Sequence, residues 1–199
     1  MQPAYYEDLI EIKNKIWLML DNAVRDRGSP FRIPVFICGN QDDFDGRIVV
    51  LRKSDQSNNL VQYHSDIRSD KISKLKDNEN ASMLFYDKEE KIQVRLKVKC
   101  TINHENEITK DSWLKTGHIS RKCYLVDSKP GTESDTPTSG LRPELDNFEF
   151  TMEQSEVGYK NFTVIQCKIK SIEWLYLAAK GHRRAKFDLE NNKEHWLIP

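Results

Sequence analysis

Basic and hydroxyl side chains gather in the first half of the chain, with types and spacing suited to binding a phosphate group. The set comprises Arg47, Arg52, Ser65, Ser69 and Lys71. The last two open a segment whose apolar residues have helical spacing. The N-terminus of a helix offers free backbone N–H groups and a partial positive charge, so a hydroxyl and a cation beside it suit an anion. The alternative at this point is that these residues are solvated charges at strand ends.

The elements that must position these residues are mostly strands. Apolar residues at helical spacing predict an N-terminal helix over about 5–27, which Gly28-Ser29-Pro30 ends. A helical pair is predicted over 111–125, and a long loop rich in Pro, Gly, Ser and Thr over about 127–159. Strand patterns cover residues 32–38, 47–52, 60–65, 81–86, 92–100, 162–177, 185–189 and 195–198. The sequence therefore predicts one mainly β domain over 1–199, with flanking helices.

Composition narrows the classes of function. Lys plus Arg and Asp plus Glu each total 31, so the formal net charge is zero. This balance argues against a nucleic-acid partner or a membrane surface, although a local basic pocket remains possible. The four cysteines are far apart, and no His lies at zinc spacing from them. We therefore expect no metal site, free thiols in a reducing compartment, and a cytoplasmic protein without signal peptide or membrane span.

Three motifs, in this order, carry a resemblance to a known family. They read Arg-Ile-Val-Val-Leu-Arg over 47–52, His-Ser-Asp-Ile-Arg-Ser-Asp-Lys over 64–71, and Phe-Tyr followed by Gln-Val-Arg over 85–95. The chain resembles the FMN-binding split-barrel family of pyridoxamine 5'-phosphate oxidase, in its oxidase-like branch of uncertain substrate. The similarity extends to residues 120–125, 130–132, 161–162, 172–175 and 196–199.

The resemblance implies a fold, a cofactor and an assembly. The implied fold is an antiparallel split β-barrel of Greek-key type with FMN as the cofactor. Two subunits are expected to form a homodimer with FMN at their interface, acting on a small-molecule substrate as an FMN-dependent oxidoreductase. The alternatives are a non-catalytic flavin-binding dimer, serving as a carrier, sensor or accessory protein, and a dimer that binds a ligand other than flavin.

The resemblance also assigns residues. Arg47, Ser65 and Lys71 would hold the FMN phosphate, and Ser120 and Arg121 would reach the flavin of the other subunit. The full set expected to bind the cofactor is Arg47, Val50, Leu51, Arg52, His64, Ser65, Ser69, Lys71, Gln93, Ser120, Arg121, Trp174 (or its neighbour Leu175) and Lys186. The substrate would meet Arg52, Arg183 and Arg184. No catalytic residue is assigned, because the flavin itself performs the redox chemistry.

Geometry and two departures from the family pattern refine these assignments. In a regular strand Arg47 and Arg52 point to opposite faces and lie roughly 16 Å apart, close to the length of a flavin nucleotide. Arg47 is therefore assigned to the phosphate and Arg52 to the ring or substrate, unless a bulge interrupts the strand. Asp70 stands where the oxidase has an arginine, and Arg183-Arg184-Ala185 matches the oxidase's Arg-Leu-His only loosely. Pyridoxamine phosphate is thus not the expected substrate.

Overall fold

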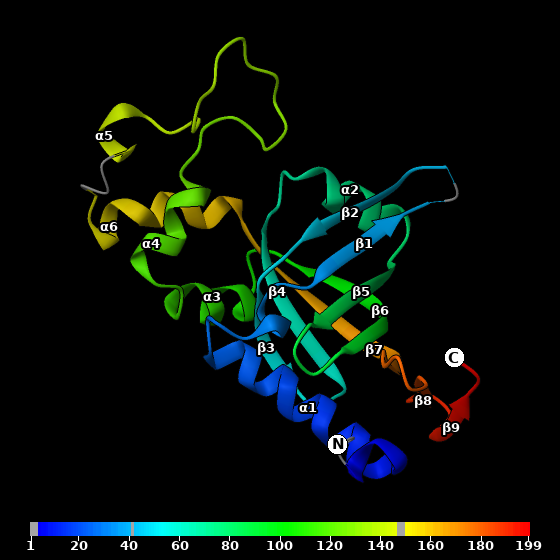
Figure 1. Cartoon of the computed structure of the whole chain (residues 1–199). Coiled ribbons are helices and arrows are strands. Elements are labelled where there is room, and N and C mark those ends of the chain that lie inside the picture. The colour runs from blue at the N-terminus through cyan, green and yellow to red at the C-terminus, as the bar shows by residue number, and fades with distance from the viewer. Residues whose placement is uncertain (1–3, 41, 147–149) are drawn as a thin grey trace.

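The fold of the computed structural model, which describes residues 4–40, 42–146 and 150–199, is one curved antiparallel sheet with helices on two sides (Figure 1). The strand order is β2-β1-β5-β6-β7-β4-β3, with β8 paired to β7 and β9 paired to β8. The strands are β1 Val35–Gly39, β2 Phe44–Ile48, β3 Leu51–Asp55, β4 Leu60–Asp66, β5 Asn80–Asp87, β6 Ile92–Asn103, β7 Phe162–Tyr176, β8 Arg183–Asp188 and β9 Lys193–Leu197.

The helices are short apart from the first. They are α1 Leu9–Arg25, α2 Asp70–Asp77, α3 Glu107–Leu114, α4 His118–Arg121, α5 Pro143–Asp146 and α6 Met152–Ser155, with 3-10 turns η1 Ala4–Glu7, η2 Pro30–Arg32, η3 Lys122–Tyr124 and η4 Glu156–Asn161. The residues expected to form a long loop therefore include α5, α6 and most of η4. None of the described helices combines the length and the apolarity needed to cross a bilayer.

Strand β7 is the centre of the sheet. One of its edges pairs with β6 along most of its length. Its other edge is shared, because β4 pairs with residues 162–168 and β8 with residues 171–176. This arrangement places β4, which carries several predicted site residues, beside the middle of the fold.

The sheet curls around one apolar core. Phe36 of β1 and Tyr63 of β4 have ring centroids 4.9 Å apart, although β5, β6 and β7 separate the two strands in the sheet. Alternate residues of β6 point inward, namely Ile92, Val94, Leu96 and Val98. No described residue of β2 pairs with β3, so the sheet is open. The predicted mainly β antiparallel fold is confirmed, whereas closure into a barrel is not.

Helix α1 covers the sheet next to β3. It begins after Asp8, whose carboxylate accepts hydrogen bonds from the backbone of Ile10 at 2.8 Å and Glu11 at 3.0 Å. Its inward stripe is fully buried and consists of Ile12, Ile16, Leu20 and Ala23. Each large aliphatic side chain of this stripe stabilises the packing by about 1.5–3 kcal/mol relative to an exposed one.

The segment from Arg47 to Arg52 is not the single regular strand that the sequence predicts. Strand β2 ends at Ile48 and β3 begins at Leu51, with the intervening Val49 N–H donating to the carbonyl of Pro34 at 3.1 Å. An irregularity in the β3–β4 pairing then leaves Arg52 without a register partner. The chain must cross here between strands at opposite ends of the sheet order. The single regular strand on which the opposite-face and 16 Å arguments for the two arginines depend is therefore absent.

Candidate functional site

A cluster of polar side chains lies at the N-terminus of α2. The ammonium of Lys71 donates to the hydroxyl of Ser65 on β4 at 2.8 Å and to the hydroxyl of Ser69 at 2.9 Å. Ser69 is the N-cap residue, but its side chain makes no capping hydrogen bond. The backbone N–H of Ile72 donates to the carbonyl of Ser69 at 2.9 Å, whereas those of Asp70 and Lys71 lack a side-chain cap and are available to an anion. We call Arg47, Ser65, Ser69 and Lys71 the α2 nook.

Arg47 adds a second cation to the α2 nook. Its guanidinium forms an ion pair with Asp45 of the same strand, while its Nε is buried without a hydrogen-bond partner among the described residues. Burial, and next the nearby charge of Arg47, lower the pKa of Lys71 to about 8. Two cations held this close raise each other's energy, and a bound anion relieves both. The charges and donors of the nook therefore suit an anionic group such as a phosphate.

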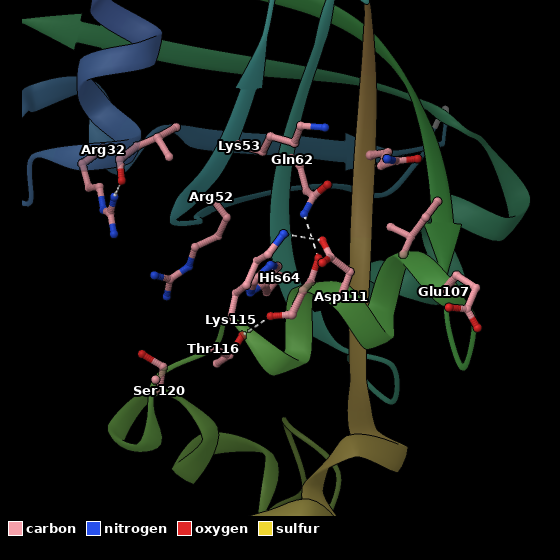
Figure 2. Close-up of a pocket in the computed structure, with 15 residues that line it drawn as sticks. Arg32, Arg52, Lys53, Gln62, His64, Glu107, Asp111, Lys115, Thr116 and Ser120 are labelled. Atoms are coloured by element: carbon pink, nitrogen blue, oxygen red, sulfur yellow. Dashed lines mark hydrogen bonds and ion pairs between the residues drawn. The ribbon is translucent and has the colours of Figure 1, made fainter.

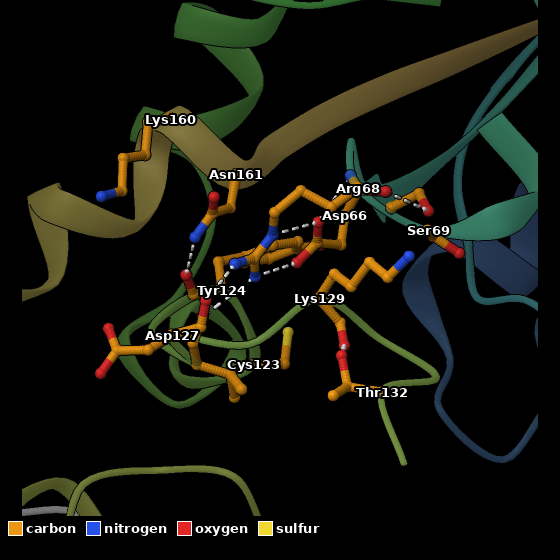
Figure 3. Close-up of polar contacts among 12 residues, drawn as sticks. Asp66, Arg68, Ser69, Cys123, Tyr124, Asp127, Lys129, Thr132, Lys160 and Asn161 are labelled. Carbon is orange, nitrogen blue, oxygen red and sulfur yellow. Dashed lines mark hydrogen bonds and ion pairs between the residues drawn. The ribbon is translucent and has the colours of Figure 1, made fainter. Parts of the chain in front are cut away.

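Asp70, the departure from the family pattern, turns away from the nook. Its side chain is 67% exposed and its Oδ2 lies 3.5 Å from the ammonium of Lys74, one turn along α2. Arg68 makes its contacts elsewhere than with Asp70. Its Nε and Nη2 donate to Asp66 at 3.0 and 2.7 Å, and it also holds two backbone carbonyls of residues 126–127 (Figure 3). Arg68 thus ties the loop after η3 to the end of β4.

Three other predicted site residues border a cleft of about 620 Å³ between the β3–β4 pair and helices α3 and α4. They are Arg52, His64 and Ser120. Burial, and next the charge of Arg52, lower the pKa of His64 to about 3. The imidazole is therefore neutral at physiological pH and offers one donor and one acceptor. Its ring meets Phe162 edge-on with centroids 4.8 Å apart.

The residues predicted for the flavin ring lie elsewhere, on the outer face of the sheet. Gln93 of β6 and Lys186 of β8 border a separate hollow of about 500 Å³. Arg184 donates from Nε to Glu173 at 3.0 Å, and Arg183 lies 3.8 Å from Glu7. Neither arginine lines the cleft that contains Arg52. Within one chain, the predicted substrate residues are therefore not brought together.

Arg121 is occupied by contacts within the described chain. Its side chain is 1% exposed, and it donates to the carbonyls of Thr116 at 3.1 Å and Trp113 at 2.8 Å, to the hydroxyl of Ser155 at 3.2 Å and to Glu156. Its guanidinium also lies 4.3 Å from the Trp113 ring centroid. Within the described chain the Arg121 side chain is thus occupied by structural contacts, and its predicted contact with the flavin of the other subunit stays a prediction. Arg121 holds α3 and α4 against η4.

Two apolar residues of the predicted set also lie in the core. Trp174 is buried and packs against Tyr6 with ring centroids 5.3 Å apart. Leu51 is buried as well, whereas Val50 is half-buried in the crossing between β2 and β3. The side chains of Trp174 and Leu51 therefore stabilise the fold, and their predicted contacts with the cofactor stay predictions.

Sequence reasoning missed two charged residues near these sites. Asp45 neutralises part of the charge of Arg47. The sequence signal for this ion pair was the two-residue spacing, which places both side chains on one face of β2. Arg32 borders the same cleft as Arg52, from the turn after α1. No pattern in the sequence connects two arginines 20 positions apart, because their proximity depends on the packing of α1 against β3.

Comparison with known proteins supports the predicted family. Residues 37–104 match the family model described as pyridoxamine 5'-phosphate oxidase, FMN-binding domain. The match confirms the resemblance and confirms FMN as the cofactor of the family domain that this segment matches. The segment contains the whole α2 nook, Arg52, His64 and Gln93. No curated protein matches the chain at a significant level.

Solved structures share the fold across the whole chain. An FMN-binding protein of Nostoc punctiforme related to pyridoxamine 5'-phosphate oxidase has a TM-score of 0.71 and 16% identity, covering 100% of both chains. PhzG of Burkholderia lata, solved with tetrahydrophenazine-1-carboxylic acid, has a TM-score of 0.69 and 16% identity, covering 100% of this chain and 98% of its own. At such identity these similarities establish the fold alone.

Proposed function

We propose that this protein binds FMN and is an oxidoreductase of the pyridoxamine-phosphate-oxidase-like type. The observation that carries the proposal is the α2 nook, in which Lys71 is fastened between Ser65 and Ser69 with Arg47 alongside. The nook lies inside the segment that matches the FMN-binding family model. Each charge-assisted hydrogen bond to a phosphate contributes about 1.5–3 kcal/mol, so three or four account for micromolar binding.

The residues divide the work of binding and orientation. Bound FMN would supply the redox chemistry by accepting a hydride equivalent from the substrate. Arg47, Ser65 and Lys71 hold the phosphate and thereby fix one end of the cofactor. The amide of Gln93 both donates and accepts hydrogen bonds, which suits the polar edge of the ring. Arg52 of β3 borders the cleft beside the β3–β4 pair and faces the substrate there (Figure 2).

We also propose that the protein works as a homodimer with FMN at the subunit interface. The residues of the α2 nook do not border the hollow that Gln93 and Lys186 line, and a second copy would supply the missing end of the FMN site. The outer face of β2, β1 and β5 exposes a strip of apolar side chains, including Phe44 at 69%, Ile48 at 63% and Tyr86 at 48%. A patch of this kind on a sheet face is typical of a protein interface.

The dimer has a direct test in solution. Ile48→Glu places a charge in the strip and should convert dimer to monomer in sedimentation velocity. Ile10→Glu, on the exposed side of α1 and 65% exposed, is the matched control and should leave the dimer intact. A wild-type monomer, or an unchanged dimer in Ile48→Glu, would contradict the assignment of this face.

The cofactor and the activity are tested on the purified protein. We expect it to be yellow and to release a molecule with the mass of FMN. Oxygen consumption with pyridoxamine 5'-phosphate and pyridoxine 5'-phosphate then separates an oxidase of these substrates from a flavin binder. Bound FMN without turnover of either would favour the alternative of a carrier, sensor or accessory dimer, or an oxidoreductase of another substrate.

A further inference from the structure

Two cysteines face each other inside the sheet, one on the central strand β7 and one on its neighbour β6. Cys100 and Cys167 are register partners in the antiparallel β6–β7 pair. Their Sγ atoms lie 3.6 Å apart, and both side chains belong to the apolar core. Both cysteines are free thiols in this structure. The two residues are 67 positions apart, so their contact depends on the register of two long strands.

The backbone at this position suits a bond between the two sulfurs. The N–H of Cys100 donates to the carbonyl of Glu79 at 2.7 Å, and thus points toward β5 and away from β7. On β7, the N–H of Ile169 donates to the carbonyl of Asn59 at 2.7 Å, beside β4, and Cys167 two residues earlier has the same orientation. Cys100 and Cys167 are therefore a non-hydrogen-bonded pair of the β6–β7 ladder.

A pair of this kind brings its side chains closest together. Opposite Cα atoms in a non-hydrogen-bonded pair lie about 4.5 Å apart. A disulfide needs Cα atoms roughly 4.4–6.8 Å apart, so the two strands can accept one without moving. Only the side chains of Cys100 and Cys167 have to turn for the sulfurs to come within bonding distance.

Cys100 can be reached from solvent, whereas Cys167 lies beneath it. Cys100 is 5% exposed and borders a hollow of about 540 Å³ between the end of α2 and the start of β5. Cys167 is fully buried, and burial raises the pKa of its thiol. A small oxidant in the hollow therefore meets the sulfur of Cys100 first, and Cys167 can act only as the second partner.

Within the described chain, the two other cysteines lie apart from this pair. Cys38 is buried on β1, and β5 separates β1 from β6 in the sheet. Cys123 lies in η3, where its exposed thiol donates to the carbonyl of Ser120 at 3.3 Å. Cys38 and Cys123 are thus internal controls, one for a buried thiol and one for an exposed thiol.

We propose that Cys100 and Cys167 form a modification site at which hydrogen peroxide closes an intramolecular disulfide. First, the sulfur of Cys100 attacks one peroxide oxygen and the O–O bond breaks, which gives a sulfenic acid and one water. The sulfur of Cys167 then attacks the sulfur of Cys100, the S–O bond breaks, and the hydroxide leaves as water with the Cys167 proton. Two thiols lose two electrons and one peroxide becomes two waters. The proposal goes beyond the flavin function and does not depend on it.

The disulfide crosslinks the two strands that pair most extensively in the fold. It also closes the chain segment between Cys100 and Cys167, which contains α3, α4, α5 and α6. A crosslink across a segment of this length restricts the unfolded chain and thereby stabilises the folded one. Oxidation should therefore leave the fold intact and make it harder to unfold.

The test is treatment of the purified protein with hydrogen peroxide, alkylation of the remaining thiols in denaturant, and peptide mapping by mass spectrometry without reduction. We expect a linked peptide pair containing Cys100 and Cys167 as the main disulfide product. Cys100→Ala and Cys167→Ala should each abolish this product. The matched controls Cys38→Ala and Cys123→Ser should leave it unchanged.

Thermal melting of the wild type keeps the test independent of how the variants fold. The crosslinked protein should melt roughly 5–15 °C above the reduced protein, and dithiothreitol applied to the unfolded chain should remove the difference. Absence of the linked peptide at a peroxide concentration that fully oxidises Cys123 would overturn the proposal. So would linkage that forms only after unfolding, a disulfide to Cys38 in its place, or a crosslinked protein that melts below the reduced one.

Discussion

The affinity of the apoprotein for FMN should depend on pH through Lys71. In the free protein the pKa of this ammonium is lowered to about 8 by burial and by the charge of Arg47. A bound phosphate dianion stabilises the protonated form and raises the pKa of Lys71 again. The complex therefore holds more protons than the free protein above pH 8, and binding must weaken as the pH rises.

The size of the effect follows from the two protonation states. At pH 7 Lys71 is largely protonated and FMN binds without taking up a proton there. At pH 9 about nine free molecules in ten carry neutral Lys71, and charging it again costs about 1.4 kcal/mol, one pKa unit. The dissociation constant should therefore rise about tenfold between pH 7 and pH 9. Arginine side chains do not titrate in this range, so the slope belongs to the lysine.

The assay is a fluorescence titration of FMN with apoprotein at several pH values between 7 and 9 and constant ionic strength. Lys71→Arg carries a charge that does not titrate in this range, so its FMN affinity should be nearly flat with pH. Riboflavin lacks the phosphate, so its affinity for the wild type should also be flat. A flat wild-type profile for FMN, or an equal slope in Lys71→Arg, would refute the placement of the phosphate beside Lys71.

Three further predictions address the same model. Combining Arg47→Ala with Lys71→Ala should cost roughly 3–6 kcal/mol of FMN affinity by titration, whereas Lys76→Ala, an exposed cation of the same helix, should have no measurable effect. Asp45→Asn removes the carboxylate that competes for Arg47, so FMN should bind several-fold more tightly, and weaker binding would show that Asp45 positions the arginine. Arg121→Ala should lower the free energy of unfolding by about 2–4 kcal/mol in chemical denaturation while leaving FMN affinity intact; a loss of FMN affinity without destabilisation would identify Arg121 as a cofactor ligand.

The α2 nook was largely predictable because its sequence signals are local. Ser69 precedes a run with helical spacing, and α2 begins directly after it, so Lys71 lies in the first turn. The even alternation of β6 likewise predicts which of its residues are buried. The relative positions of residues that are close in sequence are set by the helix or strand that contains them. Their proximity can therefore be predicted without knowing how the elements pack.

The cleft could not be predicted because its geometry depends on distant contacts. Arg52 borders it at an irregularity of the β3–β4 pairing, between Leu51 and Lys53, which no turn residue marks. Arg32 reaches it because α1 packs against β3 and presents its last carbonyls to the guanidinium. Arg121 looks like an exposed helical arginine in the sequence, and only the fold brings Glu156 against it, 35 residues away.

A crystal structure of the protein with FMN tests the central claim most directly. The account predicts that the phosphate occupies the α2 nook, with oxygens about 2.7–3.0 Å from the Lys71 ammonium and hydrogen-bonded to Ser65, Ser69 and Arg47. FMN bound with its phosphate elsewhere, while Lys71 still bridges Ser65 and Ser69 as it does here, would contradict it.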